Sequence, residues 1–271
     1  MSETAYQLAE QIIAKIGDRK PEILIILGSG LGGFAKELKN PLVIDYSEIK
    51  GFPISTVVGH SGKLIAGKVN GKEVLCMQGR IHLYEGYSPV VIADIIKAFK
   101  LVGIKTMIVT NAAGSIRKDI KPGTLMLITD HLNMSGFNPL IGPNDERFGD
   151  RFPNMNKVYC EEYQKKAEEI AKEKGIELNK GVYCMVSGPV FETPAEVRMY
   201  ATLGVDANGM STVPETMVAV YCGMKVLGIS AITNYCTGVE GGCPTHEETL
   251  ENAAKTAEDM TTLVKTFVGE L

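Results

Sequence analysis

The segment that decides the fold is VLCMQGRIHLYEGYSP, residues 74–89, which joins an apolar run to a helix start. Residues 74–77 are short and wholly apolar, as expected of a strand that is buried on both faces. Ser88 and Pro89 supply a cap and a first-turn proline for the helical pattern that follows. Residues 79–87 are therefore predicted to form a loop at the carboxyl end of a strand, where α/β proteins place their ligand sites.

Three side chains in this loop suit the recognition of an anion. Arg80 offers a rigid fork of N–H donors, His82 adds another donor, and Tyr84 supplies a flat wall with a polar tip. The alternative is a surface ion pair between Arg80 and Glu85 beside a packed histidine and tyrosine. Both interpretations fit the loop taken alone.

The composition of the chain argues against several classes of partner. The 271 residues are 45% hydrophobic with a mean hydropathy of +0.04, so the chain can bury a sizeable core. A net charge of −4 and a pI near 5.7 give no basic surface for nucleic acid or an acidic membrane. The apolar runs are shorter than the roughly 20 residues of a membrane helix, and residues 2–17 have the pattern of an amphipathic helix rather than a signal peptide.

The use of cysteine and histidine gives no sign of a metal site. The six cysteines include no C-x-x-C pair, and the four histidines form no H-E-x-x-H motif. Buried free thiols fit a reducing compartment, so we expect a cytoplasmic protein without metal or cofactor.

Short β-type runs alternate with helical patterns, which predicts an α/β fold with a largely parallel sheet and helices on both sides. The expected strands are residues 23–27, 74–77, 107–109, 125–128, 182–186 and 226–229. The expected helices are residues 90–100, 159–174, 195–202, 214–221 and 247–267. No linker or repeat divides the chain, so residues 1–271 are predicted to form a single domain, and the irregular stretch 130–156 is expected to be a functional loop.

A glycine-rich turn near the start allows a competing interpretation. GSGLGG at residues 28–33 follows a strand and fits the dinucleotide fingerprint, with Asp45 near the position of a ribose-binding acid. However, the stretch between Gly33 and Pro41 has room for only about two helical turns, too few for a crossover helix. We therefore favour a turn whose backbone N–H groups and Ser29 hydroxyl face an anion.

Residues 109–115, VTNAAGS, end another strand with small side chains. Small residues let a ligand approach the backbone, so the Ala112 amide could donate to an oxyanion. A plain tight turn explains the same residues.

The segment GPVFETPAE, residues 188–196, contains a helix start with a capping box from Thr193 to Glu196. Glu192 lies outside this box, and its carboxylate could accept N–H groups of a planar heterocycle that stacks on Phe191. The alternative is a carboxylate that only complements the helix dipole.

Three later segments add polar groups at strand ends and helix starts. Ser211 or Thr212 can cap the helix that follows, and the spare hydroxyl can face a ligand. Asn234 ends a strand and can donate or accept, whereas His246 lies in the first turn of the last helix and should be neutral there. A solvated histidine that binds no ligand would give the same sequence pattern as His246.

Taken together, these segments resemble one family. The motifs GSGLGG, STVVGHSGKL, QGRIHLYEGY, VTNAAGSI, GPNDERFGDRFPNM, GPVFETPAE, GMSTVPE and AITN occur in this order between Gly28 and Asn234. The chain is thereby similar to the trimeric purine nucleoside phosphorylases of the nucleoside phosphorylase superfamily, the purine nucleoside/methylthioadenosine phosphorylase family, over nearly its whole length.

The resemblance implies a single α/β domain with a mixed, barrel-like central sheet and a homotrimer, and it assigns roles to matching positions. Phosphate would contact Ser29, His60, Arg80, His82, Ala112 and Ser211. The purine would contact Phe191, Glu192, Asn208 and Asn234, and the ribose would contact Tyr84, Met210 and His246. The catalytic group would comprise Asn234, Glu192, His82 and His246. Phe152 would reach into the site of a neighbouring subunit.

The implied reaction is the reversible phosphorolysis of purine nucleosides in purine salvage, with phosphate as co-substrate. Cleavage develops positive charge on the sugar and negative charge on the base, which a phosphate dianion and Asn234 would stabilise. Glu192 would accept the N–H groups of hypoxanthine or guanine, whereas adenine would leave this carboxylate unpaired. We therefore expect inosine and guanosine, or their deoxy forms, as substrates.

Two departures from the family pattern keep base choice open. Asn208 replaces a small apolar residue beside the base and could broaden specificity, for example toward xanthosine. Residues 235–244 are also atypical, so His246 is matched only by its position at a helix start.

Asn234 disfavours a methylthioadenosine phosphorylase, which has an acid there. A nucleoside hydrolase would require an aspartate cluster that we do not find, and a non-catalytic purine-binding protein would not need Ser29, Arg80 and His82 together.

Overall fold

The computed structural model of the chain describes residues 3–54 and 61–271. The strands are β1 (Ile23–Leu27), β2 (Lys39–Asp45), β3 (Lys63–Val69), β4 (Lys72–Gln78), β5 (Thr106–Ser115), β6 (Leu125–Asn133), β7 (Leu178–Met185), β8 (Ala207–Gly209) and β9 (Lys225–Tyr235). The α-helices are α1 (Glu3–Ile16), α2 (Pro89–Val102), α3 (Glu161–Lys174), α4 (Pro194–Thr202), α5 (Val213–Tyr221) and α6 (His246–Gly269). Short 3-10 helices are η1 (Gly32–Glu37), η2 (Tyr46–Glu48) and η3 (Leu83–Glu85).

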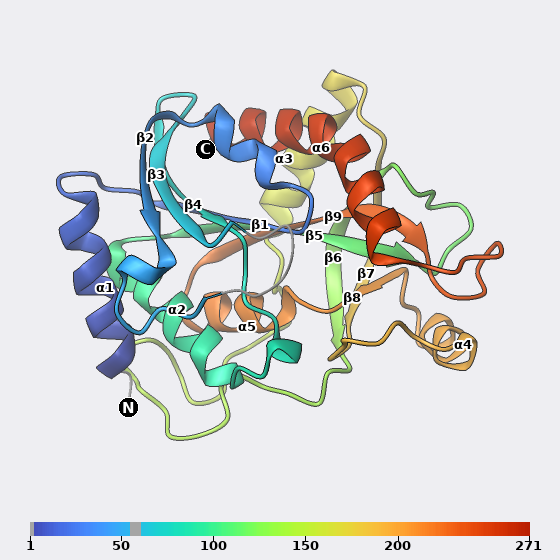
Figure 1. Cartoon of the computed structure of the whole chain (residues 1–271), viewed down its shortest axis with the longest axis horizontal. Coiled ribbons are helices and arrows are strands. Elements are labelled where there is room, and N and C mark those ends of the chain that lie inside the picture. Colours follow the sequence, from blue (N-terminus) through green and yellow to red (C-terminus); the bar gives the residue numbers. More distant parts are fainter. Residues whose placement is uncertain (1–2, 55–60) are drawn as a thin grey trace.

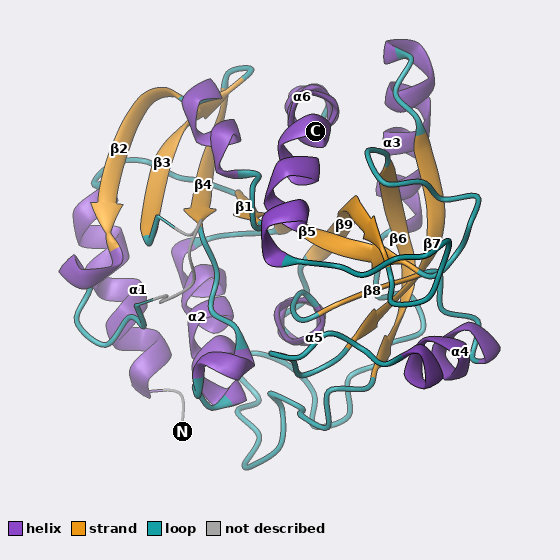
Figure 2. Cartoon of the chain, turned by 45° about the vertical axis from the view of Figure 1, so that its right-hand side comes forward, coloured by secondary structure: helices purple, strands orange, loops and turns teal. Residues whose placement is uncertain are grey.

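The nine strands found in the described residues join one mixed sheet that curls back on itself. The order is β2-β3-β4-β1-β5-β8-β7-β6-β9, and β9 also pairs with β5, which closes a ring of five strands (Figure 2). β1 lies parallel to β4 and β5, and β5 lies parallel to β9, whereas β2–β3, β3–β4, β5–β8 and β6–β9 are antiparallel. The predicted α/β domain with a mixed, barrel-like sheet is confirmed.

Helices cover both faces of the sheet, which explains why the central strand β1 is apolar throughout. In β1, Leu24 and Ile26 join one core with α1, α2 and α5, whereas Ile23, Ile25 and Leu27 join a second core with α3 and α6. Successive side chains of a strand point to opposite faces, so a strand between two helix layers has no polar face. Figure 1 shows α1, α2 and α5 on one side of the sheet and α3 and α6 on the other.

The helix that follows the decisive loop begins as predicted from its sequence and extends two residues beyond the predicted end at Lys100. The Ser88 hydroxyl accepts a hydrogen bond from the Val90 backbone N–H, and Pro89 occupies the first turn of α2. Gly103 ends the helix with φ of +117°, a left-handed conformation that glycine adopts without a steric penalty. This start fixes where the loop 79–87 leaves β4.

The predicted strands and helices are all present, but the prediction missed three strands. β2 and β3 form an antiparallel edge with polar and charged residues at many positions, and β8 spans only three residues, Ala207–Gly209. β2 and β3 each contain an apolar run of only three residues, 42–44 and 64–66, and the prediction did not count either as a strand; β8 contains no such run.

The fold brings the ends of several strands together. Because β1, β4, β5 and β9 run in one direction, their carboxyl ends lie at the same edge of the sheet.

No helix in the described residues is long and apolar enough to cross a membrane. All six cysteines are free; Cys76, Cys184, Cys222 and Cys236 are buried, Cys160 is partly buried and Cys243 is exposed.

Candidate active site

A cavity of about 270 Å³ opens at this edge of the sheet. It is lined by residues from the turn after β1, the loop after β4, the end of β5, the loop before α4, the β8–α5 segment, the end of β9 and the start of α6. These residues are Gly28, Ser29, Arg80, His82, Tyr84, Asn111, Ala112, Ala113, Gly114, Pro189, Phe191, Glu192, Asn208, Gly209, Met210, Ser211, Thr233, Asn234, His246 and Thr249.

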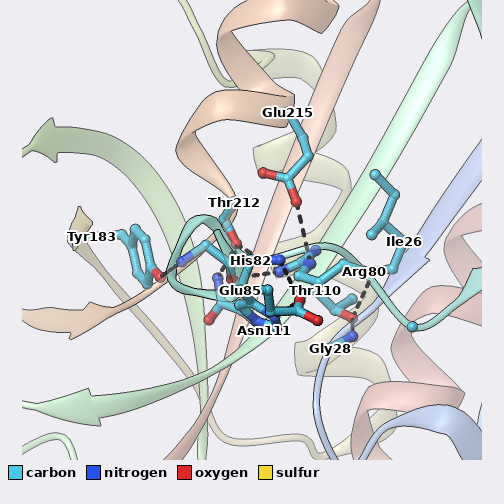
Figure 3. A network of polar contacts seen from close by, with 12 residues as sticks. Ile26, Gly28, Arg80, His82, Glu85, Thr110, Asn111, Tyr183, Thr212 and Glu215 are labelled. Carbon is cyan, nitrogen blue, oxygen red and sulfur yellow. Dashed lines mark hydrogen bonds and ion pairs between the residues drawn. The ribbon is translucent and has the colours of Figure 1, made fainter. Parts of the chain in front are cut away.

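The glycine turn after β1 is pressed against β5. The Thr110 hydroxyl accepts a hydrogen bond from the Gly28 N–H at 3.1 Å and donates to the Ile26 carbonyl at 3.0 Å, as Figure 3 shows. A Cβ at Gly28 would lie 2.6 Å from the Asn111 Cα, so only glycine fits without a shift of the backbone. This contact sets Ser29 at the cavity wall.

Arg80 is the centre of the polar end of the cavity. Its guanidinium is only 1% exposed and donates from one terminal nitrogen to the Ser211 hydroxyl at 2.7 Å and the Thr212 hydroxyl at 3.0 Å. Its Nε lies 3.3 Å from a carboxylate oxygen of Glu215, which is also buried (Figure 3). A buried carboxylate offsets the cost of desolvating the guanidinium, so the cation can remain at the cavity wall.

Thr212 holds a backbone conformation that is rare for a β-branched residue. Its φ is +80°, and its side chain is fully buried. Its hydroxyl accepts hydrogen bonds from Arg80 and from the Asn111 amide at 2.9 Å. These contacts hold the strained turn, which aims Ser211 at Arg80.

This arrangement corrects one expectation from the sequence. Ser211 or Thr212 was expected to cap α5, but Thr212 stands at the cap position without a side-chain cap bond. Both hydroxyls instead accept hydrogen bonds from Arg80, because a buried guanidinium requires acceptors for its N–H groups.

His82 and Tyr84 form a second wall of the polar end. Their rings stack with centroids 4.7 Å apart, and His82 Nδ1 lies 3.5 Å from a carboxylate oxygen of Glu85. Burial and the nearby Glu85 charge raise the pKa of Tyr84 to about 12, so its hydroxyl remains a hydrogen-bond donor. The interpretation of this loop as a surface ion pair between Arg80 and Glu85 is wrong, because Arg80 is buried against Ser211 and Glu215.

A carboxylate defines the opposite end of the cavity. Glu192 is 8% exposed; one oxygen accepts the Thr237 backbone N–H at 3.1 Å, and the other lies 3.4 Å from the Asn208 side-chain nitrogen. The Cys236 thiol donates to the Asn208 carbonyl at 3.1 Å. Burial, followed by the charge of Glu192, raises the pKa of Cys236 well above its usual value, so this thiol stays protonated.

Asn234 lies beside this carboxylate end with its amide fixed. Its carbonyl accepts the Thr233 hydroxyl at 2.9 Å, and its nitrogen donates to the Tyr235 carbonyl at 3.0 Å. One amide hydrogen therefore stays bound to the backbone, and the group keeps a single orientation in the cavity.

An apolar wall connects the two ends. Phe191 is 40% exposed at the mouth, and Met210 packs beside Tyr84 and the backbone of Gly188. A Cβ at Gly188 would lie 2.5 Å from the Met210 sulfur and 3.0 Å from a ring carbon of Tyr84. An aromatic ring and a thioether are both side chains that make favourable contacts with a flat ring.

Most residues predicted from the sequence meet in this one cavity. The predicted residues that line it are Ser29, Arg80, His82, Tyr84, Ala112, Phe191, Glu192, Asn208, Met210, Ser211, Asn234 and His246. His60 lies outside the described residues. Phe152 is not among the lining residues and is 88% exposed.

The sequence analysis missed the partners of the functional side chains. Glu215, Thr212 and Asn111 fix Arg80 and Ser211, and Cys236 with Thr237 fixes the carboxylate end. The GMSTVPE motif contains two of these residues, but their role depends on an arginine more than a hundred positions away.

The dinucleotide interpretation of the glycine turn is wrong. η1 (Gly32–Glu37) follows the turn, and the chain then enters an edge strand, so no crossover α-helix begins there. Asp45 is exposed at the end of β2 and does not line the cavity. Within the described parts of the chain, no three histidine, cysteine, aspartate or glutamate side chains are grouped to hold a metal ion.

Comparisons with known proteins agree with one another. A family model described as the Phosphorylase superfamily matches residues 22–269. Purine nucleoside phosphorylase 1 of Bacillus subtilis (strain 168) is 48% identical over 250 residues, which cover 92% of each chain. Purine nucleoside phosphorylase of Bos taurus is 43% identical over 273 residues, covering 98% of this chain and 94% of the bovine one. The crystal structure of Schistosoma mansoni purine nucleoside phosphorylase in complex with inosine has a TM-score of 0.94 at 40% identity, covering 99% of this chain and 96% of that one.

Proposed function

Since the chain belongs to the phosphorylase superfamily and is a purine nucleoside phosphorylase, we propose that its cavity holds phosphate at Arg80 and a 6-oxopurine at Glu192. The enzyme is a pentosyltransferase that transfers a sugar from a purine to phosphate. The observation that carries the assignment of the two ends is the buried Arg80–Ser211 pair at one end of the cavity and the buried Glu192 carboxylate at the other.

The polar end suits a phosphate dianion. Arg80, Ser211 and the turn at Ser29 come from three separate chain segments and converge on one wall, and His82 and the Ala112 amide lie on the same cavity. A guanidinium with neighbouring hydroxyls and backbone N–H groups matches the geometry of phosphate oxygens. We place His60 in the same group on the resemblance alone.

The reaction then needs no covalent enzyme intermediate. A phosphate oxygen forms a bond to the anomeric carbon while the bond from that carbon to the base nitrogen breaks, and the base leaves with the electron pair. The held dianion faces the positive charge that develops on the sugar, and the Asn234 amide faces the negative charge on the departing base. Tyr84, Met210 and His246 would hold the ribose between the two ends.

The carboxylate end selects the base. Hypoxanthine and guanine present ring N–H groups that Glu192 can accept, whereas adenine presents a lone pair to the same oxygens. A buried carboxylate that loses its donors can disfavour the wrong base by about 10⁴-fold. Phe191 would stack on the purine ring.

A second candidate substrate is xanthosine. Asn208 brings a polar side chain, 4% exposed, to the carboxylate end of the cavity, where the base would bind and which we call the base end. This side chain could accommodate a further oxygen on the base. A comparison of xanthosine with inosine distinguishes the two candidates through the ratio of their kcat/KM values.

The test of the proposed function is product analysis with and without phosphate. The purified protein is incubated with inosine, and we expect hypoxanthine and ribose 1-phosphate only when phosphate is present. Release of hypoxanthine without phosphate would instead indicate a hydrolase. If no product forms but the protein binds hypoxanthine added separately, the result would indicate a purine-binding protein.

We further propose that the protein acts as a homotrimer in which Phe152 completes the site of a neighbour. Phe152 is 88% exposed in the single chain, and Ile141, eleven residues earlier in the same irregular stretch, is 73% exposed. Large apolar side chains exposed together indicate a contact surface.

A further inference from the structure

Asn208 is a buried polar side chain in the cavity to which the reaction scheme above gives no definite role. It is 4% exposed, and it belongs to the three-residue strand β8. A polar group buried at a binding wall costs free energy unless it is hydrogen-bonded. Its position and its partners therefore bear on what the base end of the cavity recognises.

The strand register places Asn208 between the two other polar groups of the base end. Gly114 of β5 is paired with Asn208 of β8 on one side and with Asn234 of β9 on the other. A Cβ at Gly114 would lie 2.9 Å from the Asn234 nitrogen and 3.6 Å from the Asn208 carbonyl oxygen. On its far side, Asn208 contacts Glu192 at 3.4 Å. The order along the wall is thus Asn234, Asn208, Glu192.

The two neighbours of Asn208 fix the direction of its amide. Cys236 donates its thiol hydrogen to the Asn208 carbonyl, and the Asn208 nitrogen faces the carboxylate of Glu192. In the opposite orientation the carbonyl oxygen would face a carboxylate oxygen, which is repulsive. Because burial raises the pKa of Cys236, the thiol keeps the hydrogen that it donates.

We propose that Asn208 donates a hydrogen bond to the 6-oxygen of the purine, and that Cys236 holds its amide in the orientation required. This inference rests on the proposed function, because it assumes that a purine occupies the cavity. The amide nitrogen carries two hydrogens, and the contact with Glu192 uses only one.

The order of groups on the base agrees with the order of groups on the wall. Along one edge of a purine, the imidazole nitrogen N7, the substituent on C6 and the ring nitrogen N1 follow one another. Asn234, Asn208 and Glu192 present their polar groups in the same sequence. A 6-oxygen would accept from Asn208, whereas a 6-amino group would direct its own hydrogens at the same donor. Asn208 would also stabilise the negative charge that the 6-oxygen gains as the base departs.

The first experiment replaces Asn208 with leucine, which has a similar branched shape but no amide. Steady-state kinetics are measured with inosine and with purine riboside, which has no substituent on C6. We expect kcat/KM for inosine to fall by roughly tenfold to a hundredfold while that for purine riboside changes little. Equal losses with both substrates, or an unchanged kcat/KM for inosine, would overturn the assignment to the 6-oxygen.

The second experiment tests the orienting role of Cys236 with a matched pair of variants. Cys236→Ala removes the donor and frees the amide to turn, so the preference for inosine over adenosine should decrease, by about tenfold. Cys236→Ser keeps a hydroxyl donor and should preserve the preference of the unaltered enzyme. An unchanged preference in Cys236→Ala would refute the orienting role.

Binding of free bases separates this inference from the proposed function. Calorimetry with hypoxanthine and with unsubstituted purine requires no turnover. Asn208→Leu should weaken the binding of hypoxanthine but not that of purine, even if the enzyme proves not to use phosphate. Similar weakening of both would contradict the inference while leaving phosphorolysis untouched.

Discussion

At the scale of single residues, the ion pair of Arg80 and Glu215 is a feature whose loss would have a large energetic consequence. Both side chains are almost completely buried, with Nε and a carboxylate oxygen 3.3 Å apart. Removing one partner of such a pair leaves an uncompensated buried charge, which costs about 3–5 kcal/mol. In the proposed complex, a bound phosphate would supply further negative charge to the same guanidinium.

Glu215→Gln is expected to destabilise the phosphate-free protein and to increase its stabilisation by phosphate. Glutamine retains an acceptor for Arg80 Nε but not the charge, so the free energy of unfolding should fall by about 3 kcal/mol without phosphate. Phosphate should then recover part of the loss, because it binds only the folded chain. Urea unfolding with and without phosphate measures both effects.

The matched control for this prediction is Glu22→Gln, which removes the exposed ion pair with Lys105. Exposed pairs contribute about 0–1 kcal/mol, so this variant should unfold like the parent. A Glu215→Gln protein that is as stable as the parent, or that gains less from phosphate, would contradict the proposed role of the pair.

The sequence identified the residues that line the cavity better than the residues that support them. Arg80 and Glu192 could be predicted because each lies in a loop next to a recognisable strand end or helix start. Glu215 and Cys236 could not, because their effect arises from side chains 135 and 28 positions away that only the folded sheet brings near. Local spacing carries no signal for such contacts.

At the scale of elements, the turn after β1 shows how closely two backbones approach at the site. Gly28 lies against Thr110 and Asn111 of β5, and its N–H is bound to the Thr110 hydroxyl. The turn is therefore fixed by the neighbouring strand, and the position of Ser29 depends on it.

Gly28→Ala is expected to reduce phosphorolysis strongly and to destabilise the fold. The new Cβ would lie 2.6 Å and 2.9 Å from backbone atoms, so the turn must shift away from β5 and carry Ser29 with it. Overpacking of this kind costs about 1–3 kcal/mol. The KM for phosphate and the urea midpoint are the measurements.

Gly33→Ala is the control in the same glycine run. A Cβ at Gly33 meets nothing within 4 Å, and the residue is exposed. Its kinetics and stability should match the parent. If the two alanine variants behaved alike, the close approach of Gly28 to β5 would not be what positions the turn.

Prediction of the elements succeeded where burial was complete and failed at the edge. β1, β5 and β9 lie between two helix layers, so their apolar runs were visible in the sequence. β2 carries exposed residues at most of its positions because it is an antiparallel edge, and its pattern resembles that of a loop. Polar edge strands are recognised only once a partner strand is known.

At the scale of the whole molecule, Phe152 gives a test of the proposed trimer. Phe152→Ala should leave the folded chain unchanged, because the side chain is 88% exposed and supports no core. If a neighbouring subunit uses it, kcat/KM for inosine should fall by at least tenfold. Sedimentation should still report a trimer. Unaltered kinetics in this variant would remove Phe152 from the site.

Stability should also depend on pH through His131. Its Nδ1 lies 3.1 Å from the buried Tyr159 hydroxyl, and burial lowers the pKa of His131 despite the nearby charge of Asp130. The unfolded chain then binds a proton more readily than the folded chain below about pH 6.5. The contribution of His131 is complete above that pH and is lost as the pH falls.

His131→Gln should flatten this dependence. The free energy of unfolding of the parent is expected to fall more steeply between about pH 6.5 and 5 than that of the variant, by at most about 1.4 kcal/mol per pH unit. His246→Gln, at an exposed position, should keep the slope of the parent. Parallel curves for the parent and His131→Gln would contradict the prediction.

The uneven burial of the cysteines has a practical consequence for studying this enzyme in solution. Burial raises the pKa of Cys184 and of Cys222 to about 12, which leaves almost no thiolate to react with an electrophile. Cys243 is exposed and follows the chain segment that binds Glu192 through Thr237. A maleimide fluorophore should therefore attach mainly to Cys243, next to the base end of the cavity, where its emission can follow nucleoside binding without any engineered label site.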